Sequence, residues 1–412
     1  MNGNLARPRL VIAVNSAIAL RFLQGQLEYF QHAGFDVTVL CPERRKDEWS
    51  VARPAGIPII EVPIQREIAP WPDLQSLWRL WRIIRALRPT VTNVGTPKAG
   101  LLGGLAAWLN RVPCRFYTLH GLRFETTKGL RRRILIFAER LACRFAHRVI
   151  CVSQSVREKA IASGLTSRNR TIVLGSGSCN GIDASRFAAT PDTMTRAAGL
   201  RHHLGIPERA PVVICVGRLT SDKGIPELIG AFSQVGDRFP ELRLLLVGCF
   251  EDGDPLPVDT RRSLETHPRV IFAGAVNDTA PYYAMADVVV LPSHREGLPT
   301  VVLEAHAAGK PVVGASATGI VDVVVDGETG LLFPLGDVPA LAKALARVIS
   351  DKALANKLGL AGQEQVKRKF GQEQIWEALH REYLGFLQRK DRPLSLMPYA
   401  DRSGSLAAGS RE

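Results

Sequence analysis

Short apolar runs of strand length alternate with segments of helical periodicity along most of this chain, and this alternation constrains its fold more than any other feature. Apolar strands separated by amphipathic helices are typical of parallel sheets that helices cover on both faces. The series runs through the first half and starts again after residue 210. We therefore predict an α/β protein with two doubly wound domains. A length of 412 residues, too long for one ordinary core, agrees with this prediction.

The first series contains six predicted strands and the helices between them. The helix over 73–89 is expected to be capped by Asp73 and followed by Pro89. The predicted strands are 9–14, 36–40, 57–62, 91–95, 114–121 and 148–153, and the other predicted helices are a segment that ends at Gly34, then 98–110, 129–146 and 154–163.

The second series contains five predicted strands with helices between them, at 211–217, 242–248, 269–274, 287–293 and 310–316. The segment around 180–210 is rich in Gly, Ser and other small residues and marks the junction of the domains. We predict a first domain over 1–185 and a second over 186–371. A final helix over 372–390 precedes a tail, 391–412, that lacks periodicity and is expected to be disordered.

We expect the protein to be made and kept in the cytoplasm. Seven scattered cysteines without a CxxC pair are typical of free thiols, not of a disulfide framework or a zinc site. The longest weakly polar stretch, 99–109, is shorter than the roughly 20 residues that span a bilayer. The apolar run near the start is too short for the core of a signal peptide.

The excess of positive over negative charge is confined to the first half of the chain. Residues 1–180 contain 27 Lys and Arg against 11 Asp and Glu, a net charge of +16, whereas the remainder has 26 basic and 28 acidic residues. Such asymmetry favours a polyanionic partner for the first half, namely nucleic acid, an anionic membrane or a phosphorylated substrate. A basic surface that serves only solubility is the alternative.

Two cations follow the strand at 211–217, at the strand-to-helix turn. Arg218 and Lys223 stand five positions apart before a predicted helix, and the carboxyl ends of strands are where open α/β sheets bind ligands. Arg as a planar fork and Lys as a point charge, with the amides of a helix start nearby, could hold a diphosphate. Two exposed surface cations are the alternative.

Two glutamates follow the strand at 287–293. Glu296 lies in the loop, and Glu304 lies more than a turn inside the apolar helix that follows Pro299 and is closed by Gly309. A carboxylate on such a helix needs donors, and the vicinal hydroxyls of a ribose are suitable. The amides of Thr300 and Val301 would face a phosphate or a sugar oxygen. A structural salt bridge is the alternative for Glu304.

Several of these segments, in the same order, resemble the donor domain of the family 4 retaining glycosyltransferases of the GT-B fold. The resemblance rests on GRLTSDKGIPELIGAF (217–232), VGCFEDGD (247–254) and the segment 282–333, which contains EGLPTVVLE (296–304) with the E-x7-E spacing of the family. It implies two Rossmann-like domains that face a cleft, with the helix 372–390 packed back on the first domain. It also implies a nucleotide-sugar donor and retention of anomeric configuration.

The resemblance assigns roles to single residues. It implies that Arg218 and Lys223 hold the donor diphosphate, that Glu304 binds the ribose, and that Glu296 and His120 face the transferred sugar. The expected catalytic set is therefore His120, Glu296, Arg218 and Lys223. A structural role is the alternative for His120. The further expected donor contacts are Val276 to a uracil base by its backbone, Gly297, Leu298, Thr300 and Val301 around the helix start, and Asn15 and Arg21 from a first loop that lacks the usual glycine pair.

Segments 94–125 and 174–187 resemble the branch of this family that assembles bacterial capsules and glycans. The resemblance implies a UDP-N-acetylhexosamine or UDP-hexose donor and a saccharide acceptor linked to polyprenyl diphosphate, with Lys98 near the acceptor. No metal and no cofactor are expected, because no DxD follows a strand and no His and Asp ligands cluster.

Two other classes of protein remain open at this point. A nucleotide-sugar epimerase of similar fold would need acid and base carboxylates in the first half, where acidic residues are scarce. A nucleic-acid-binding protein would explain the basic half, but no aromatic residues alternate with the basic ones there and no known module is present, so no nucleic-acid partner is expected.

The segment 126–148 mixes apolar and basic residues on one predicted helix, including Arg131, Arg132 and Arg133. This mixture suits the interface of an anionic membrane, which would bring the protein to the inner face of the cytoplasmic membrane and to a lipid-linked acceptor. We therefore include the three arginines among the acceptor-side residues. A packed helix with a solvated basic face is the alternative.

Overall fold

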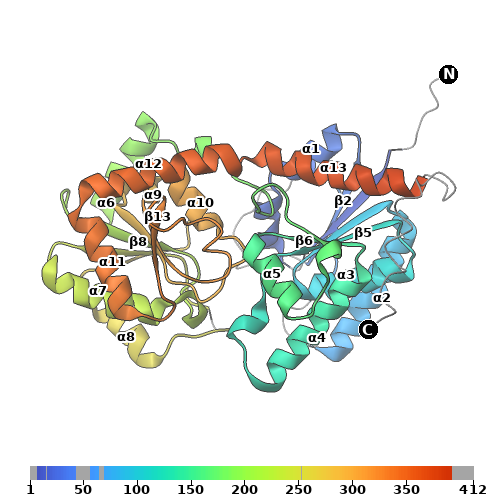
Figure 1. Cartoon of the computed structure of the whole chain (residues 1–412), viewed down its shortest axis with the longest axis horizontal. Coiled ribbons are helices and arrows are strands. Elements are labelled where there is room, and N and C mark those ends of the chain that lie inside the picture. Colours follow the sequence, from blue (N-terminus) through green and yellow to red (C-terminus); the bar gives the residue numbers. More distant parts are fainter. Residues whose placement is uncertain (1–6, 15, 43–55, 65–68, 252, 392–412) are drawn as a thin grey trace, which may run out of the picture.

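The computed structural model describes residues 7–14, 16–42, 56–64, 69–251 and 253–391, and these form two lobes (Figure 1). Each lobe is built on a parallel sheet, with strand order β3-β2-β1-β4-β5-β6-β7 in the first and β10-β9-β8-β11-β12-β13 in the second. The predicted fold, two doubly wound α/β sheets, is confirmed.

The first lobe contains seven strands among the described residues. They are β1 (Arg9–Ala13), β2 (Asp36–Cys41), β3 (Ile59–Glu61), β4 (Val91–Gly95), β5 (Cys114–Leu119), β6 (Arg148–Cys151) and β7 (Thr171–Ile172). Its helices are η1 (Ala17–Leu23), α1 (Gln26–His32), α2 (Pro70–Leu87), α3 (Pro97–Leu109), η2 (Arg123–Thr126), α4 (Gly129–Phe145), α5 (Gln154–Ala162) and η3 (Arg168–Arg170).

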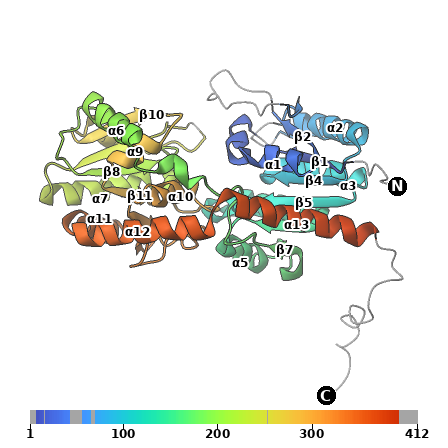
Figure 2. The ribbon, with the colours of Figure 1, turned by 90° about the horizontal axis from the view of Figure 1, so that it is seen from above.

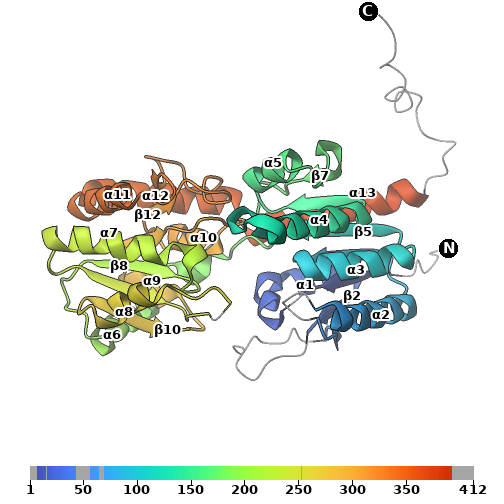
Figure 3. The same cartoon turned by 90° about the horizontal axis from the view of Figure 1, so that it is seen from below.

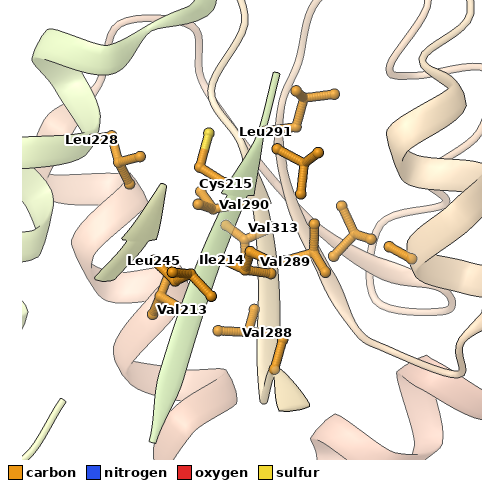
Figure 4. Packing of buried hydrophobic residues seen from close by; sticks show 14 of the residues in the cluster. Val213, Ile214, Cys215, Leu228, Leu245, Val288, Val289, Val290, Leu291 and Val313 are labelled. Atoms are coloured by element: carbon orange, nitrogen blue, oxygen red, sulfur yellow. The ribbon is translucent and has the colours of Figure 1, made fainter. Parts of the chain in front are cut away.

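The described part of the second lobe forms six strands, β8 (Val212–Val216), β9 (Arg243–Val247), β10 (Val270–Gly274), β11 (Val288–Leu291), β12 (Val312–Ala315) and β13 (Gly330–Phe333). Its helices are η4 (Ala184–Phe187), α6 (Pro191–His203), η5 (Ser221–Lys223), α7 (Ile225–Arg238), α8 (Val258–Thr266), α9 (Ala280–Met285), α10 (Thr300–Ala307), α11 (Val338–Ser350) and α12 (Lys352–Lys369). Buried aliphatic side chains of its central strands pack together in one continuous core (Figure 4).

The observed elements differ from the predicted ones in the start of one helix and in two additional strands. The helix expected to start at Asp73 begins at Pro70, and the carboxylate of Asp73 accepts a bond from Ala69 N one turn back, at 3.2 Å. The edge strands β7 and β13 were not predicted, because β7 has two residues and β13 follows a turn with no helix between β12 and itself. The predicted tail lies outside the described residues, except for Asp391, which ends the last helix.

The last helix, α13 (Gln372–Asp391), returns from the second lobe to the first and runs along its sheet (Figure 2). Its Tyr383 is fully buried among aromatic side chains, with its ring 4.8 Å from that of Phe116. The Tyr383 hydroxyl accepts a bond from Asn93 Nδ2 at 2.7 Å, and Thr118 Oγ1 donates to Asn93 Oδ1 at 2.8 Å. The helix is therefore part of the core of the first lobe.

A buried carboxyl group beneath α4 gives the first lobe a pH-dependent stability. Glu139 is 2% exposed, and Tyr117 donates a hydrogen bond to its Oε2 at 2.7 Å. Burial raises the pKa of Glu139 to about 7. In the unfolded chain Glu139 loses its proton near the ordinary pKa of a glutamate. The unfolded state therefore gains stability relative to the folded state as the pH rises from that pKa to about 7.

We expect Glu139→Gln to remove this dependence. The shift corresponds to roughly 3 kcal/mol, so the variant should unfold at a higher denaturant concentration than wild type at pH 8 and differ little at pH 4. Unfolding should be followed by denaturant titration at both pH values, with Glu208→Gln, an exposed change before β8, as the control. Equal pH slopes in wild type and Glu139→Gln would contradict the assignment.

Candidate functional site

The predicted diphosphate cations lie where β8 ends and α7 begins. Arg218 follows the strand after one glycine, and Lys223 ends η5. Arg218 pairs with Glu251, and its other nitrogen lies 3.7 Å from Asp222. Lys223 Nζ lies 2.5 Å from Glu296 Oε1. The structure thus brings both cations to the carboxylates of neighbouring loops, so they are not isolated surface charges.

Gly224 allows this turn to pack closely on the end of β11. Its φ is 70°, in the left-handed region, and a Cβ there would lie 2.1 Å from the carbonyl oxygen of Pro292. Only glycine tolerates both conditions. The close packing holds Lys223, the preceding residue, beside the loop that carries Glu296.

Glu304 lies one turn inside α10, as predicted, and is partly buried. Its Oε2 accepts bonds from Tyr283 Oη at 3.0 Å and from Thr279 Oγ1 at 3.2 Å. Burial raises the pKa of Glu304, and both hydroxyl bonds oppose this shift. The alternative of a structural salt bridge is wrong for the described part of the chain, in which no cation lies within 4.0 Å of this carboxylate.

His120 belongs to the first lobe but contacts the second. A Cβ at Gly297 would lie 1.9 Å from the carbonyl oxygen of His120, so the two backbones touch. The His120 ring lies against Gly95, where a Cβ would be 2.7 Å from Nε2. Burial lowers the pKa of His120 to about 4, so the ring is neutral near pH 7. A neutral ring can donate or accept one hydrogen bond at each nitrogen but carries no charge.

The other predicted donor residues surround the same junction. Arg21 donates to Asn277 Oδ1 at 3.2 Å, across from the first lobe to the loop after β10 that contains the partly buried Val276. Leu298 packs toward Gly177 of the first lobe, and the carbonyl oxygen of Val301 lies 3.3 Å from Tyr283 Oη. Thr300 is the first residue of α10. Asn15 lies outside the described residues.

A loop of the second lobe connects Glu296 to the first lobe. Glu296 N donates to Thr318 O at 2.9 Å, and Gly319 N donates to Ser155 Oγ at 2.7 Å. Ser155 N donates to Asp322 Oδ1 at 3.0 Å, and Ser155 Oγ contacts the other oxygen of that carboxylate. Asp322 therefore caps the N-terminus of α5 across the junction, where a negative charge is favourable. These bonds fix the loop that carries Glu296 relative to His120.

We expect Asp322→Asn and Ser155→Ala to lower the turnover of a reaction at this junction by roughly tenfold, because each removes a charge-assisted bond between the lobes. Nucleotide affinity should stay near the wild-type value, since neither residue contacts the cations near β8. Steady-state kinetics and nucleotide titration separate the two effects, with exposed Glu328→Gln as the control. A double variant whose loss equals or exceeds the product of the two single losses would contradict a direct bond.

The predicted acceptor-side residues belong to the first lobe. Lys98 forms an ion pair with Asp73, 2.6 Å away, within the first lobe. Arg131, Arg132 and Arg133 are exposed on the first turn of α4, and Arg132 also stacks over the ring of Phe124 at 5.6 Å. Lys98 thus stands three residues after Gly95, which lies against the His120 ring, whereas the three arginines stand at the start of α4.

The partners of the cations could not be predicted from the sequence. Arg295 donates to Asp222 Oδ2 at 2.9 Å and to Thr126 Oγ1 of the first lobe at 3.0 Å, which adds a third cation beside Arg218. The sequence feature that could have indicated Arg295 is its position directly before Glu296. No group of three His, Cys, Asp or Glu side chains able to hold a metal is present among the described residues. No described helix is long and apolar enough to cross a membrane.

Comparisons with known proteins agree with this geometry. Residues 199–365 match the family of glycosyl transferases group 1, and residues 19–177 match the glycosyl transferase 4-like domain. The capsular polysaccharide biosynthesis glycosyltransferase CapM of Staphylococcus aureus is 33% identical over 381 residues, which cover 92% of this chain and 97% of CapM. The UDP-Gal:alpha-D-GlcNAc-diphosphoundecaprenol alpha-1,3-galactosyltransferase of Escherichia coli is 26% identical over 80% of this chain and 84% of its own length.

A solved structure shares the fold. Anabaena Alr3699/HepE, crystallised in complex with UDP and glucose, superposes with a TM-score of 0.75 over 92% of this chain and 100% of its own, at 22% identity. The two-lobed architecture, the two family matches and the similarity to CapM over nearly the full length agree with one another. The chain is therefore a glycosyltransferase of family 4 with the GT-B fold, a member of the glycosyl transferases group 1.

Proposed function

We propose that this glycosyltransferase moves a sugar from a UDP-sugar to a saccharide linked to polyprenyl diphosphate, with retention of anomeric configuration. The observation that carries the proposal is the ion pair between Lys223 and Glu296. It lies in the loop after β11, next to the backbone of His120. The name of the E. coli relative describes a UDP-sugar donor and a diphosphoundecaprenol acceptor, and HepE was solved with UDP. CapM acts in capsular polysaccharide biosynthesis.

In this proposal Arg218 and Lys223 bind the donor diphosphate and stabilise the charge that develops on it as the glycosidic bond breaks. Both cations are paired with carboxylates, Arg218 with Glu251 and Lys223 with Glu296, and the donor diphosphate would add its oxygens to these partners. The amides of Thr300 and Val301 at the start of α10 add donors with a favourable helix dipole. No metal or cofactor is part of the proposal.

The nucleoside and the sugar are assigned to separate groups. Among the described residues no protein group donates to Glu304 Oε1, which leaves this oxygen for the ribose hydroxyls. The backbone of Val276 is assigned to the uracil base. Glu296 and the neutral ring of His120 are assigned to hydroxyls of the transferred sugar. Gly297 and Leu298 shape the donor site between these groups.

The experiment that tests the proposal measures UDP release from a panel of UDP-sugars, with and without polyprenyl-diphosphate-linked saccharides. Release that requires both substrates, with an α-linked product from an α-linked donor by NMR, is the expected result. Conversion of UDP-N-acetylglucosamine to its epimer without acceptor would instead support an epimerase. Activity with a soluble saccharide but not with the lipid-linked one would reject the acceptor assignment.

We further propose that α4 brings the enzyme to the anionic membrane surface that holds such an acceptor. Leu130 and Phe137 are 73% and 61% exposed on α4, next to the exposed Arg131, Arg132 and Arg133. Large apolar and basic side chains on one exposed helix suit a membrane interface. The protein would then act at the inner face of the cytoplasmic membrane.

Reversing the charge of these three arginines to Glu should sharply reduce pelleting with anionic vesicles at low salt, because each contributes about 1 kcal/mol near such a surface. UDP affinity should not change. High salt should release the wild-type protein as well, since it screens surface charge. Wild-type protein that stays in the supernatant at low salt would contradict the proposal and favour a soluble acceptor.

A further inference from the structure

The exposed face of α2 changes from apolar to basic along its length. Trp71, Leu74 and Trp78 are 73%, 55% and 55% exposed, and the exposed Arg82 and Arg85 follow on the same stripe of the helix. Three large apolar side chains in succession on an exposed stripe mark an interaction surface. Tryptophan in particular prefers the region where apolar chains meet water. We name these five residues the α2 surface.

The basic end of the α2 surface borders a shallow hollow without a carboxylate. The residues that line the hollow are Arg9, Trp78, Trp81, Arg82, Arg85, Ala86 and Arg88. Arg82 stacks over Trp78 at 4.8 Å, and Arg85 stacks over Trp81 at 5.4 Å. Stacking fixes the plane of each guanidinium and leaves its edge donors available for an anion. Four guanidinium groups in one hollow repel one another, so a bound anion would stabilise them.

The hollow is separate from the donor site. Arg9 is the first residue of β1, whereas the donor residues follow the carboxyl ends of their strands, so the hollow lies at the opposite end of the first sheet. Helices α2, α3 and α4 lie side by side on one face of that sheet (Figure 3). Trp108 and Leu109, at the end of α3, are also about half exposed, and Asn110 Nδ2 binds Trp81 O at 3.0 Å. The apolar and basic surface therefore continues from α2 to its neighbour.

We propose that the α2 surface binds an anionic phospholipid of a bilayer, with the lipid phosphate in the arginine hollow and Trp71, Leu74 and Trp78 in the interfacial region. Arginine forks match the oxygens of a phosphate, and the adjacent tryptophans favour a ligand that carries apolar chains over a free anion. The only acidic residue within α2, Asp73, is paired with Lys98, so no unpaired carboxylate of this helix repels the headgroup. This site is additional to α4 and does not rest on the proposed transferase reaction.

The test measures binding of the full chain to vesicles of phosphatidylcholine alone and of phosphatidylcholine mixed with phosphatidylglycerol, without donor or acceptor. Arg82→Gln with Arg85→Gln should weaken binding to the mixed vesicles about thirtyfold. Arg79→Gln is the matched control, because Arg79 is exposed on the same helix but does not line the hollow. It should weaken binding by no more than a few-fold.

A second measurement reports on the apolar end. Mixed vesicles should shift the tryptophan fluorescence of wild-type protein to shorter wavelength, and Trp71→Ser with Leu74→Ser should reduce both this shift and the binding that survives at high salt. Circular dichroism establishes that each variant is folded. Equal losses in Arg79→Gln and in the Arg82 and Arg85 variant would overturn the site in favour of diffuse attraction.

Two further outcomes would also overturn the proposal. If inorganic phosphate binds to the hollow as well as the mixed vesicles do, the ligand is a soluble anion. Salt-dependent binding of DNA without binding of vesicles would identify nucleic acid as the partner. Absence of sugar transfer in any of these proteins would concern only the proposed function, because vesicle binding is measured without substrates.

Discussion

Replacing Lys223 by Ala should lower kcat/KM for sugar transfer roughly a hundredfold to a thousandfold and weaken UDP binding roughly tenfold to a hundredfold. Lys223 Nζ lies 2.5 Å from Glu296 Oε1, and both side chains are largely shielded from water. The loss removes the point charge proposed for the diphosphate. It also leaves the Glu296 carboxylate without its cation next to the incoming phosphates, so repulsion adds to the lost attraction.

Arg218→Ala should act in the same direction, since its guanidinium is the second cation of the proposed diphosphate site. Lys343→Ala, which removes an exposed cation from α11 of the same lobe, is the matched control and should leave both quantities unchanged. UDP affinity should be measured by calorimetry and transfer by UDP release. A folded double variant of Arg218 and Lys223 with wild-type UDP affinity would remove the diphosphate assignment.

The two glutamates should separate into different kinetic classes. Glu304→Gln should weaken UDP binding roughly tenfold and lower turnover, because a neutral amide accepts less strongly from the ribose hydroxyls. Glu296→Gln should chiefly lower turnover or alter the choice of sugar, with UDP affinity near that of wild type. Equal loss of UDP affinity in both variants would show that this division of roles is wrong.

The pH dependence of UDP binding gives an independent check on Glu304. Burial raises the pKa of this carboxyl above its ordinary value. Protonation should therefore begin to weaken UDP binding at a higher pH than for an ordinary glutamate. Glu304→Gln should lose that part of the dependence. A dependence that is the same in wild type and Glu304→Gln would assign it to another group.

Features carried by local pattern could be predicted from the sequence. The apolar runs predicted eleven of the thirteen described strands, and Gly309 marks the end of α10 with a φ of 68°. Glu304 lies within that helix as expected because strand, turn and helix signals all lie within a few residues of it. The two missed strands, β7 and β13, are defined by pairing with neighbours, not by their own composition.

Features that depend on contact between distant segments could not be predicted. Glu251 is 33 positions from Arg218, and Asp322 is 167 positions from Ser155, so no periodicity connects either pair. The sequence predicts an amphipathic helix over 73–89, but only the fold shows that Trp71 and Trp78 are exposed. Which side of an amphipathic helix is covered depends on the layer next to it, and that layer is set by topology.

The two passages of the chain between the lobes are bonded to each other. Ile182 N donates to Phe370 O at 2.8 Å, and Ile182 pairs with Gly371 in a parallel bridge. A single tether would let one lobe swing in any direction, whereas two joined tethers resist twisting and leave bending about one axis. The lobes would then open and close by bending about that one axis. Each closure would return the loop of Glu296 to the backbone of His120. Because few relative orientations are possible, less entropy must be lost before reaction.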